Sequence, residues 1–300
     1  MKLSLQQTIL LFGLLLFSFN GSTQPNLEWF DTTIVNSSST FGIVTDDLGN
    51  SYSTGNISGT TDFDNGPGVT MISPTNALYV AKHRPSGSLI WVKIIDPATG
   101  SGLGTSITLD TAGNVVLTGY FTGTTDFDPG PGVTNLTPQG SEDVFAVMLD
   151  SAGTFVWANS FGGTLQDYGS EIIADTMGNT FITGWFHGTA DFDGTIINTY
   201  GIEDVFVLKL NSLGSLVWVK RFGGSGDEKG YGIDVDLAGN VYTTGYFNNT
   251  CDFDPSGATA NLTSPGSRDC FVSKLDNNGN YVWAKQFSGT NNNRSMDISV

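Results

Sequence analysis

The sequence predicts an all-β fold, a β-propeller of four-stranded antiparallel blades, and periodic features along the whole chain support that prediction. An Asp-Phe-Asp motif recurs at intervals of 61 to 65 residues, beginning at Asp62, Asp126, Asp191 and Asp252. A Gly-Asn dipeptide and a tryptophan return in the same phase. Several landmarks that share one period indicate a repeat architecture in which each unit is one supersecondary element.

The composition is typical of many short strands joined by tight turns. The chain of 300 residues contains 39 glycines, and only 14% of its residues are charged. Its formal net charge is −17. A nucleic-acid partner requires a basic patch, so we expect no nucleic-acid binding.

Residues 1–22 differ from the repeats and predict a secretory signal peptide. Lys2 precedes an apolar run at 9–17, and small polar residues follow it. The run is too short to cross a bilayer comfortably, and no other segment resembles a transmembrane helix. We therefore expect repeats over 23–300 in a protein that is secreted or held at the cell surface.

Each repeat contains four β-branched or aromatic runs bounded by turn residues. In the second repeat we expect strands at 106–109, 115–127, 144–149 and 155–158. Asp-x-x-Gly sequences, such as Asp110 to Gly113, close the first and second hairpins. In such turns the aspartate caps the turn and the glycine adopts a positive φ.

Four strands at this spacing favour propeller blades over a β-solenoid, whose coils are shorter and lack two tight turns per unit. Small residues in the first strands fit an innermost position around a channel. The expected complete blades are approximately 40–97, 104–163, 169–224 and 230–289. Residues 27–30 resemble a fourth strand and residues 295–300 a first strand. We expect these two to belong to partial blades, and the chain to be a fragment of a larger propeller.

The recurring stretch, best preserved at 113–132 and 239–255, resembles the SBBP repeat proteins, a family named for a seven-bladed β-propeller. The resemblance covers nearly all of the chain after residue 22. It implies a secreted or surface protein, often from Bacteroidetes-like bacteria and commonly with a C-terminal secretion-sorting domain. The family implies no shared catalytic residues.

Repeated carboxylates are the main candidate for a metal site. Two aspartates of each motif would share one strand face, and in three blades a further aspartate precedes the third strand. Hard oxygen ligands suit Ca²⁺. The alternative, which we favour, is that these side chains cap turn amides. The candidate ligands are Asp62, Asp64, Asp126, Asp128, Asp143, Asp191, Asp193, Asp204, Asp252, Asp254 and Asp269.

No nucleophile motif, zinc motif or phosphate-binding loop is present, so we expect no catalysis and no cofactor besides the calcium considered above. The predicted function is an interaction scaffold that binds protein or glycan. The alternative is an extracellular carbohydrate-active enzyme that uses carboxylates on one face of the propeller. The periodic tryptophans are expected to pack between blades rather than bind sugar.

Cys251 and Cys270 are the only cysteines. They are expected late in the second strand and early in the third strand of the fourth blade, which form one hairpin. In a secreted chain such facing positions favour a disulfide, and two buried thiols are the alternative.

Overall fold

The computed structural model describes residues 38–300 except 65–67 and 98. All regular elements in this part of the chain are β-strands, and all paired strands are antiparallel. The prediction of an all-β fold is therefore confirmed. The expected signal peptide at 1–22 and the expected strand at 27–30 lie outside the described residues.

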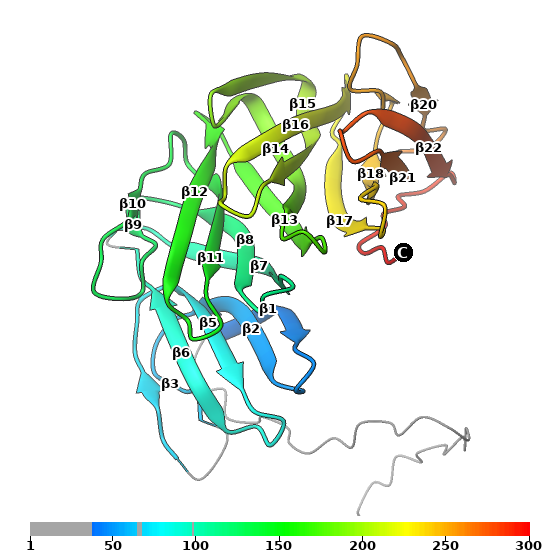
Figure 1. Ribbon diagram of the computed structural model, residues 1–300. Helices are drawn as coiled ribbons and strands as arrows, with labels where there is room; N and C mark the ends of the chain where they lie inside the picture. Colours follow the sequence, from blue (N-terminus) through cyan, green and yellow to red (C-terminus); the bar gives the residue numbers. More distant parts are fainter. Residues whose placement is uncertain (1–37, 65–67, 98) are drawn as a thin grey trace, which may run out of the picture.

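Four consecutive blades make up the described chain, each with four strands hydrogen-bonded in chain order (Figure 1). The first blade contains β1 (Ser38–Thr45), β2 (Ser51–Ile57), β5 (Ala77–His83) and β6 (Leu89–Ile95). The second contains β7 (Gly102–Leu109), β8 (Val115–Phe121), β11 (Asp143–Leu149) and β12 (Phe155–Gly163). The third contains β13 (Asp167–Ala174), β14 (Thr180–Phe192), β15 (Thr195–Leu210) and β16 (Leu216–Gly224). The fourth contains β17 (Lys229–Val235), β18 (Val241–Phe247), β21 (Asp269–Leu275) and β22 (Tyr281–Phe287).

Turns of the Asp-x-x-Gly type, or its close variants, close the first and last hairpins of every blade. At the first turn of the second blade, Gly113 donates its N–H to the carbonyl of Asp110 at 2.9 Å. The Asp110 carboxylate accepts the N–H groups of Ala112 and Asn114. The glycine of each of these eight turns has a φ between +75° and +84°, where a side chain would be strained. The predicted turn chemistry is confirmed.

A smaller hairpin extends each blade between its second and third strands. Three of these hairpins pair β3 (Thr61–Asp62) with β4 (Met71–Ile72), β9 (Thr125–Asp126) with β10 (Asn135–Leu136), and β19 (Thr250–Asp252) with β20 (Asn261–Thr263). In the third blade β14 and β15 are themselves long enough to form it. A tight Asp193-Gly194 turn explains this, because both residues have positive φ values, 52° and 84°.

These small hairpins also join neighbouring blades. Gly162 of β12 pairs with Asp191 of β14, and Gly223 of β16 pairs with Asp252 of β19. The outermost strand of one blade thus forms hydrogen bonds with the Asp-Phe-Asp segment of the next blade. The motif therefore has an architectural role between blades as well as within them.

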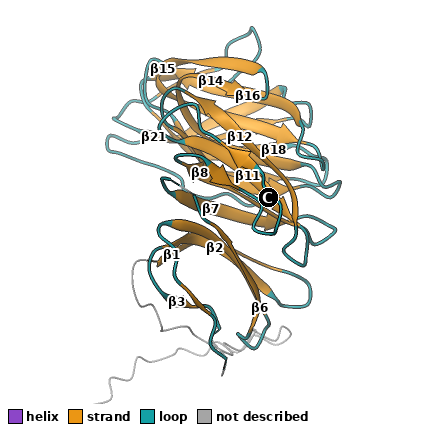
Figure 2. Ribbon diagram, turned by 90° about the vertical axis from the view of Figure 1, so that its left-hand side faces the viewer, coloured by secondary structure: helices purple, strands orange, loops and turns teal. Residues whose placement is uncertain are grey.

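The four blades lie in an arc with β1, β7, β13 and β17 on its inner side (Figure 1). The view from the side shows only strands and loops among the described residues (Figure 2). Small residues allow the inner strands to approach one another. A Cβ atom on Gly169 would lie 2.5 Å from Thr118 Oγ1, and one on Gly230 would lie 2.5 Å from Thr183 Oγ1. The described residues form an open arc rather than a closed ring.

The fourth-strand tryptophans of the first three blades, Trp91, Trp157 and Trp218, pack against the next blade, as predicted. Trp91 donates its indole N–H to the carbonyl of Ser151 in the next blade at 3.2 Å. Trp218 makes the equivalent contact with Asn277. The turn glycine beside each of these contacts lies over the tryptophan ring, where a larger residue would clash.

The expected strand at 295–300 is not formed. These residues lie beside β17, where a Cβ on Gly232 would be 2.9 Å from Asp297 Cα, yet they have no ladder partner. In each blade the first strand pairs with the strand that follows it in the chain. No such following strand lies among the described residues, so the segment packs against its neighbour without forming a sheet.

Candidate functional site

The first aspartate of each Asp-Phe-Asp motif closes a loop. Asp126 Oδ1 accepts the N–H of Asp128 at 3.1 Å and that of Thr134 at 2.7 Å. Asp62 and Asp252 make the equivalent pairs of bonds in their own blades. In the third blade Asp191 accepts the N–H of the turn glycine instead. These carboxylates are acceptors for backbone amides, as the capping interpretation requires.

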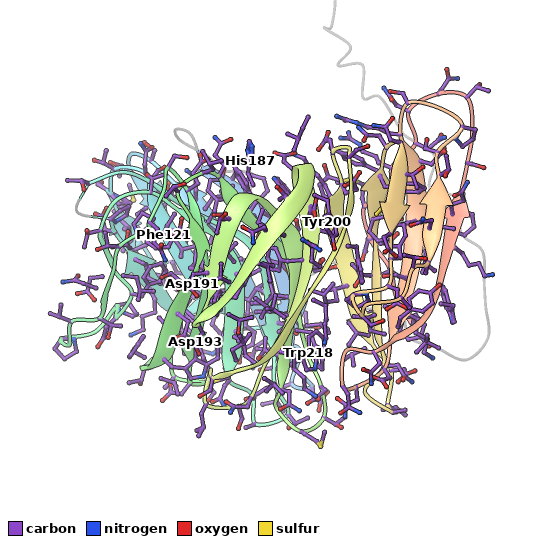
Figure 3. All side chains as sticks on the ribbon, turned by 90° about the horizontal axis from the view of Figure 1, so that it is seen from above. Phe121, His187, Asp191, Asp193, Tyr200 and Trp218 are labelled. Carbon is purple, nitrogen blue, oxygen red and sulfur yellow. The ribbon has the colours of Figure 1, made fainter. Side chains whose placement is uncertain are left out.

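The second aspartate of the motif does not share a strand face with the first, which corrects our prediction. β3, β9 and β19 end at the first aspartate, and Asp193 has the positive φ of a turn residue. Asp128 Oδ1 accepts the N–H of Gly130 at 2.7 Å, and Asp254 caps Ser256 in the same way. Figure 3 shows Asp191 and Asp193 on the β14–β15 hairpin. The phenylalanine between the two aspartates is buried in every blade.

The aspartate before the third strand is buried, apart from the other two. Asp143 is 2% exposed, and Asp204 and Asp269 are 0% exposed. Asp143 and Asp204 accept the backbone N–H groups of Gln139 and Tyr200. Within the described residues no three His, Cys, Asp or Glu side chains are grouped as a metal site requires. The predicted calcium ligands of one blade are thus not brought together.

Buried carboxyl groups instead meet in pairs where blades join. Asp143 and Asp167 lie at the junction of the second and third blades, and Asp204 and Glu228 at the next. Burial raises the pKa of Asp143 and of Asp204 to about 6. Burial together with the neighbouring carboxylate raises the pKa of Asp167 to about 7 and that of Glu228 to about 8. Sequence reasoning missed Asp167 and Glu228, although they follow the Gly-Gly of the preceding strand by four residues.

The described strands form a groove of about 780 Å³, which we call the inner groove. β1, β7 and β13 form its floor, and Tyr231, Met296 and Asp297 lie at one side. Phe41, Ile43 and Met296 line it and are 55%, 68% and 55% exposed. An exposed apolar lining inside a concave surface is typical of a binding site.

Aromatic rings form a continuous row along one end of the inner groove. Tyr168 contacts Tyr120 with ring centroids 4.4 Å apart and stacks on Trp185 at 4.9 Å. Trp185 in turn contacts Tyr231 at 5.8 Å. Lys229 lies over the Trp185 ring, 4.3 Å from its centroid. The row crosses from the second blade to the fourth and makes a rigid wall.

Glu171 is the one acidic residue that β13 places in the lining of the inner groove. Its carboxylate accepts the backbone N–H of Ile233 in the next blade. Burial, and then the negative charges of Asp297 and Asp234, raise its pKa to about 7. Sequence reasoning missed Glu171, although a signal was available. The same position in the other blades carries Gly42, Ser106 and Gly232, so an acid there interrupts the repeat.

The two cysteines are free thiols, which corrects the expected disulfide. Cys251 lies in β19 opposite Leu262, and Cys270 lies in β21 opposite Tyr246. β18 ends at Phe247 and β19 begins at Thr250. Cys251 therefore belongs to the small β19–β20 hairpin rather than to the four main strands of the blade. Cys251 is buried, and burial raises the pKa of its thiol.

No helix among the described residues could cross a membrane, since none has the required length and apolarity.

Comparisons with known proteins point to the same architecture. A family model described as SBBP, a beta-propeller repeat, matches residues 217–250. An uncharacterised WD repeat-containing protein of Acanthamoeba polyphaga mimivirus is 24% identical over 318 residues, which cover 86% of this chain. The chain spans only 23% of that relative's length.

A search of solved structures gave a weak likeness to the crystal structure of the S-layer protein SbsC, domains 7, 8 and 9. That likeness has a TM-score of 0.11 and 9% identity, and it covers 54% of this chain and 74% of the other. Such a TM-score does not indicate a shared fold. The repeat match and the WD-repeat relative, together with the antiparallel blades, support a β-propeller repeat family.

Proposed function

We propose that this chain is a non-catalytic interaction module, secreted or exposed at the cell surface, that binds a protein or glycan partner through the inner groove. The observation that supports this proposal is the exposed apolar lining of the groove on a rigid scaffold of strands. Repeat β-propellers suggest protein-interaction scaffolds, which agrees with such a surface. Export is proposed from the signal-like sequence at 1–22.

The repeated aspartates contribute to this function only through the scaffold. Their carboxylates accept backbone N–H groups and hold loops in place. A carboxylate that caps a loop in this way has a structural role that requires no substrate or cation. Capping aspartates therefore support a structural rather than a catalytic role.

Partner binding is testable with arrays of glycans and of peptides probed with the purified chain. Phe41→Asp places a charge on the apolar lining of the groove and should abolish the binding seen with the unmodified chain. Val217→Asp is a matched control, because Val217 is 52% exposed on the outermost strand β16 and lies outside the groove. Equal binding by the wild-type and Phe41→Asp chains would contradict the proposal.

A second candidate function is an extracellular carbohydrate-active enzyme. Glu171 favours it, because a carboxyl group with a pKa of about 7 in a groove is suited to general acid catalysis. A screen for polysaccharide cleavage tests this candidate. Activity that is lost in Glu171→Gln, and kept in Asp128→Asn and Asp193→Asn, would favour the enzyme over the scaffold.

A further inference from the structure

The inner groove has an acidic lining, and Lys229, which lies over the Trp185 ring, is already paired with Glu203 at 2.8 Å. Glu171 and Asp297 line the groove, and its described lining contains no Lys, Arg or His side chain. The remaining lining is apolar, aromatic or small and polar. The chain as a whole is strongly acidic, with a formal charge of −17. Such a field attracts cationic partners and raises their rate of association.

The carboxylate of Glu171 is only partly used by the fold. One of its oxygens, Oε2, accepts the N–H of Ile233, as Ser106 Oγ accepts the N–H of Ile172 one blade earlier. A serine therefore suffices for the contact between blades. The second oxygen, Oε1, has no hydrogen bond in the described part of the chain and is not among its buried, unpaired atoms. A glutamate at this position adds a charge that the fold does not require.

The groups around Glu171 disfavour its charge while the groove is empty. β17 contributes Asp234, and the segment after β22 contributes Asp297, both of which raise the pKa of Glu171. β7 contributes only neutral groups to the lining, Thr105, Ser106 and Thr108, and the lining residues of β1 carry no charge. A bound cation would lower the pKa of Glu171 and would release a proton near pH 7.

We propose that the inner groove binds a peptide segment of a partner protein that inserts a lysine or arginine side chain beside Glu171 and Asp297. Apolar residues of the same segment contact Phe41, Ile43 and Met296. Glu171 is the residue that determines specificity for the cationic side chain. This inference rests on the function proposed above, because it identifies the partner's chemistry at the same groove.

Charge complementarity distinguishes this occupant from other partners. A neutral glycan would leave both carboxylates without a counter-charge, and an acidic ligand would be repelled. We expect an arginine-containing segment to bind about tenfold more tightly than a neutral analogue of the same shape, because a hydrogen bond to a charged group is stronger than one between neutral groups.

The test uses three fluorescently labelled peptides with leucines on both sides of a central arginine, citrulline or glutamate. Fluorescence anisotropy with the whole chain should give an order of affinity of arginine, then citrulline, then glutamate. In Glu171→Gln the preference for arginine over citrulline should fall to less than about threefold. Asp47→Asn is the matched control, since Asp47 is an exposed acid outside the groove. It should keep the preference, and melting curves should show that both variants are folded.

Proton linkage supplies a readout that a purely structural role of Glu171 would not produce. Affinity for the arginine peptide should rise severalfold, and by no more than about tenfold in total, as the pH increases from 6 to 8 and Glu171 becomes charged. That rise should be absent in Glu171→Gln. Equal affinities for the arginine and citrulline peptides, or a full preference in Glu171→Gln, would overturn the inference.

The possible failures remain distinguishable. If Phe41→Asp abolishes array binding while arginine is not preferred, the groove binds a partner and only the inferred chemistry is wrong. If no array ligand depends on Phe41, the proposed function itself fails. Concentration-dependent self-association in analytical ultracentrifugation, abolished by Phe41→Asp, would show that a second copy occupies the groove and would also overturn the inference.

Discussion

Replacing Asp143 with asparagine should stabilise the protein at alkaline pH. Asp143 Oδ1 and Asp167 Oδ2 lie 2.7 Å and 2.8 Å from the point that a Cβ on Gly162 would occupy, so the two carboxyl groups face a common space. Asp143 Oδ2 accepts the N–H of Gln139, whereas the buried Oδ1 has no partner among the described residues. The asparagine side chain can still accept the N–H of Gln139 through its oxygen, and its NH₂ group takes the place of the unpaired oxygen beside Asp167.

The sign follows from the direction of the pKa shifts. The pKa of Asp143 rises from 3.8 to about 6 and that of Asp167 to about 7 in the folded state. A carboxyl group whose pKa is raised by folding stabilises the folded state fully at a pH below its pKa in the unfolded chain. This contribution is lost as the pH rises through its pKa in the folded protein. Two pKa units correspond to roughly 2.7 kcal/mol. The variant should therefore gain on the order of 1–3 kcal/mol at pH 8 and little at pH 4.

Urea denaturation followed by tryptophan fluorescence at pH 4, 6 and 8 measures this effect through the denaturation midpoint. Asp269→Asn is the control, because Asp269 already accepts an N–H from the Asn293 side chain at 3.2 Å. Asp269→Asn relieves no repulsion between carboxylates, so the increase in its urea midpoint at pH 8 should be smaller than that of Asp143→Asn. If Asp143→Asn lowers the midpoint equally at pH 4 and pH 8, the reasoning is wrong.

Three further predictions concern the scaffold. Gly214→Ala should lower the free energy of unfolding by about 1–3 kcal/mol through the positive φ of Gly214, and further through a clash with the Trp157 ring 2.7 Å away. The melting temperature should therefore fall more than in Gly113→Ala, where the position of the added Cβ is open. Asp126→Ala should lower the melting temperature equally with and without chelator, since it removes a cap worth about 1–2 kcal/mol. A drop of several degrees for the wild type in chelator would instead indicate calcium. Both cysteines should titrate as thiols in denaturant without reductant; absence of thiols would restore the disulfide.

Much of the fold could be predicted because its determinants are local. The turn aspartates and glycines act within four residues of chain, and their chemistry is visible in the sequence. The periodic tryptophans identified the contact between blades because the same residue returned at each period. The phenylalanine of each Asp-Phe-Asp motif is the apolar residue between two aspartates, and it is buried in every blade.

The errors arose where a segment changes its pairing partner. We expected 115–127, and the matching stretch of the fourth blade, each to form one continuous strand. That would place Asp126 and Asp128 on one face and Cys251 opposite Cys270. β8 ends at Phe121 and β18 ends at Phe247, and the residues that follow them turn outward toward the preceding blade. Gly123 has a φ of 69° and Asn249 a φ of 55°, which redirects the backbone after these strand ends. Alternation along a strand predicts side-chain direction only while the strand continues.

A repeat protein offers its own internal control for separating structure from function. Carboxylates that recur at one position in several blades were expected to cap backbone amides in each. Asp62, Asp126 and Asp252 each accept the N–H of the residue eight positions later in the described loops. A charged residue that occurs in one blade only, where its counterparts are glycine or serine, has no such explanation. Glu171 meets this criterion, and it also lines the inner groove. Departures from the repeat, rather than its most regular motif, therefore direct attention to the binding surface.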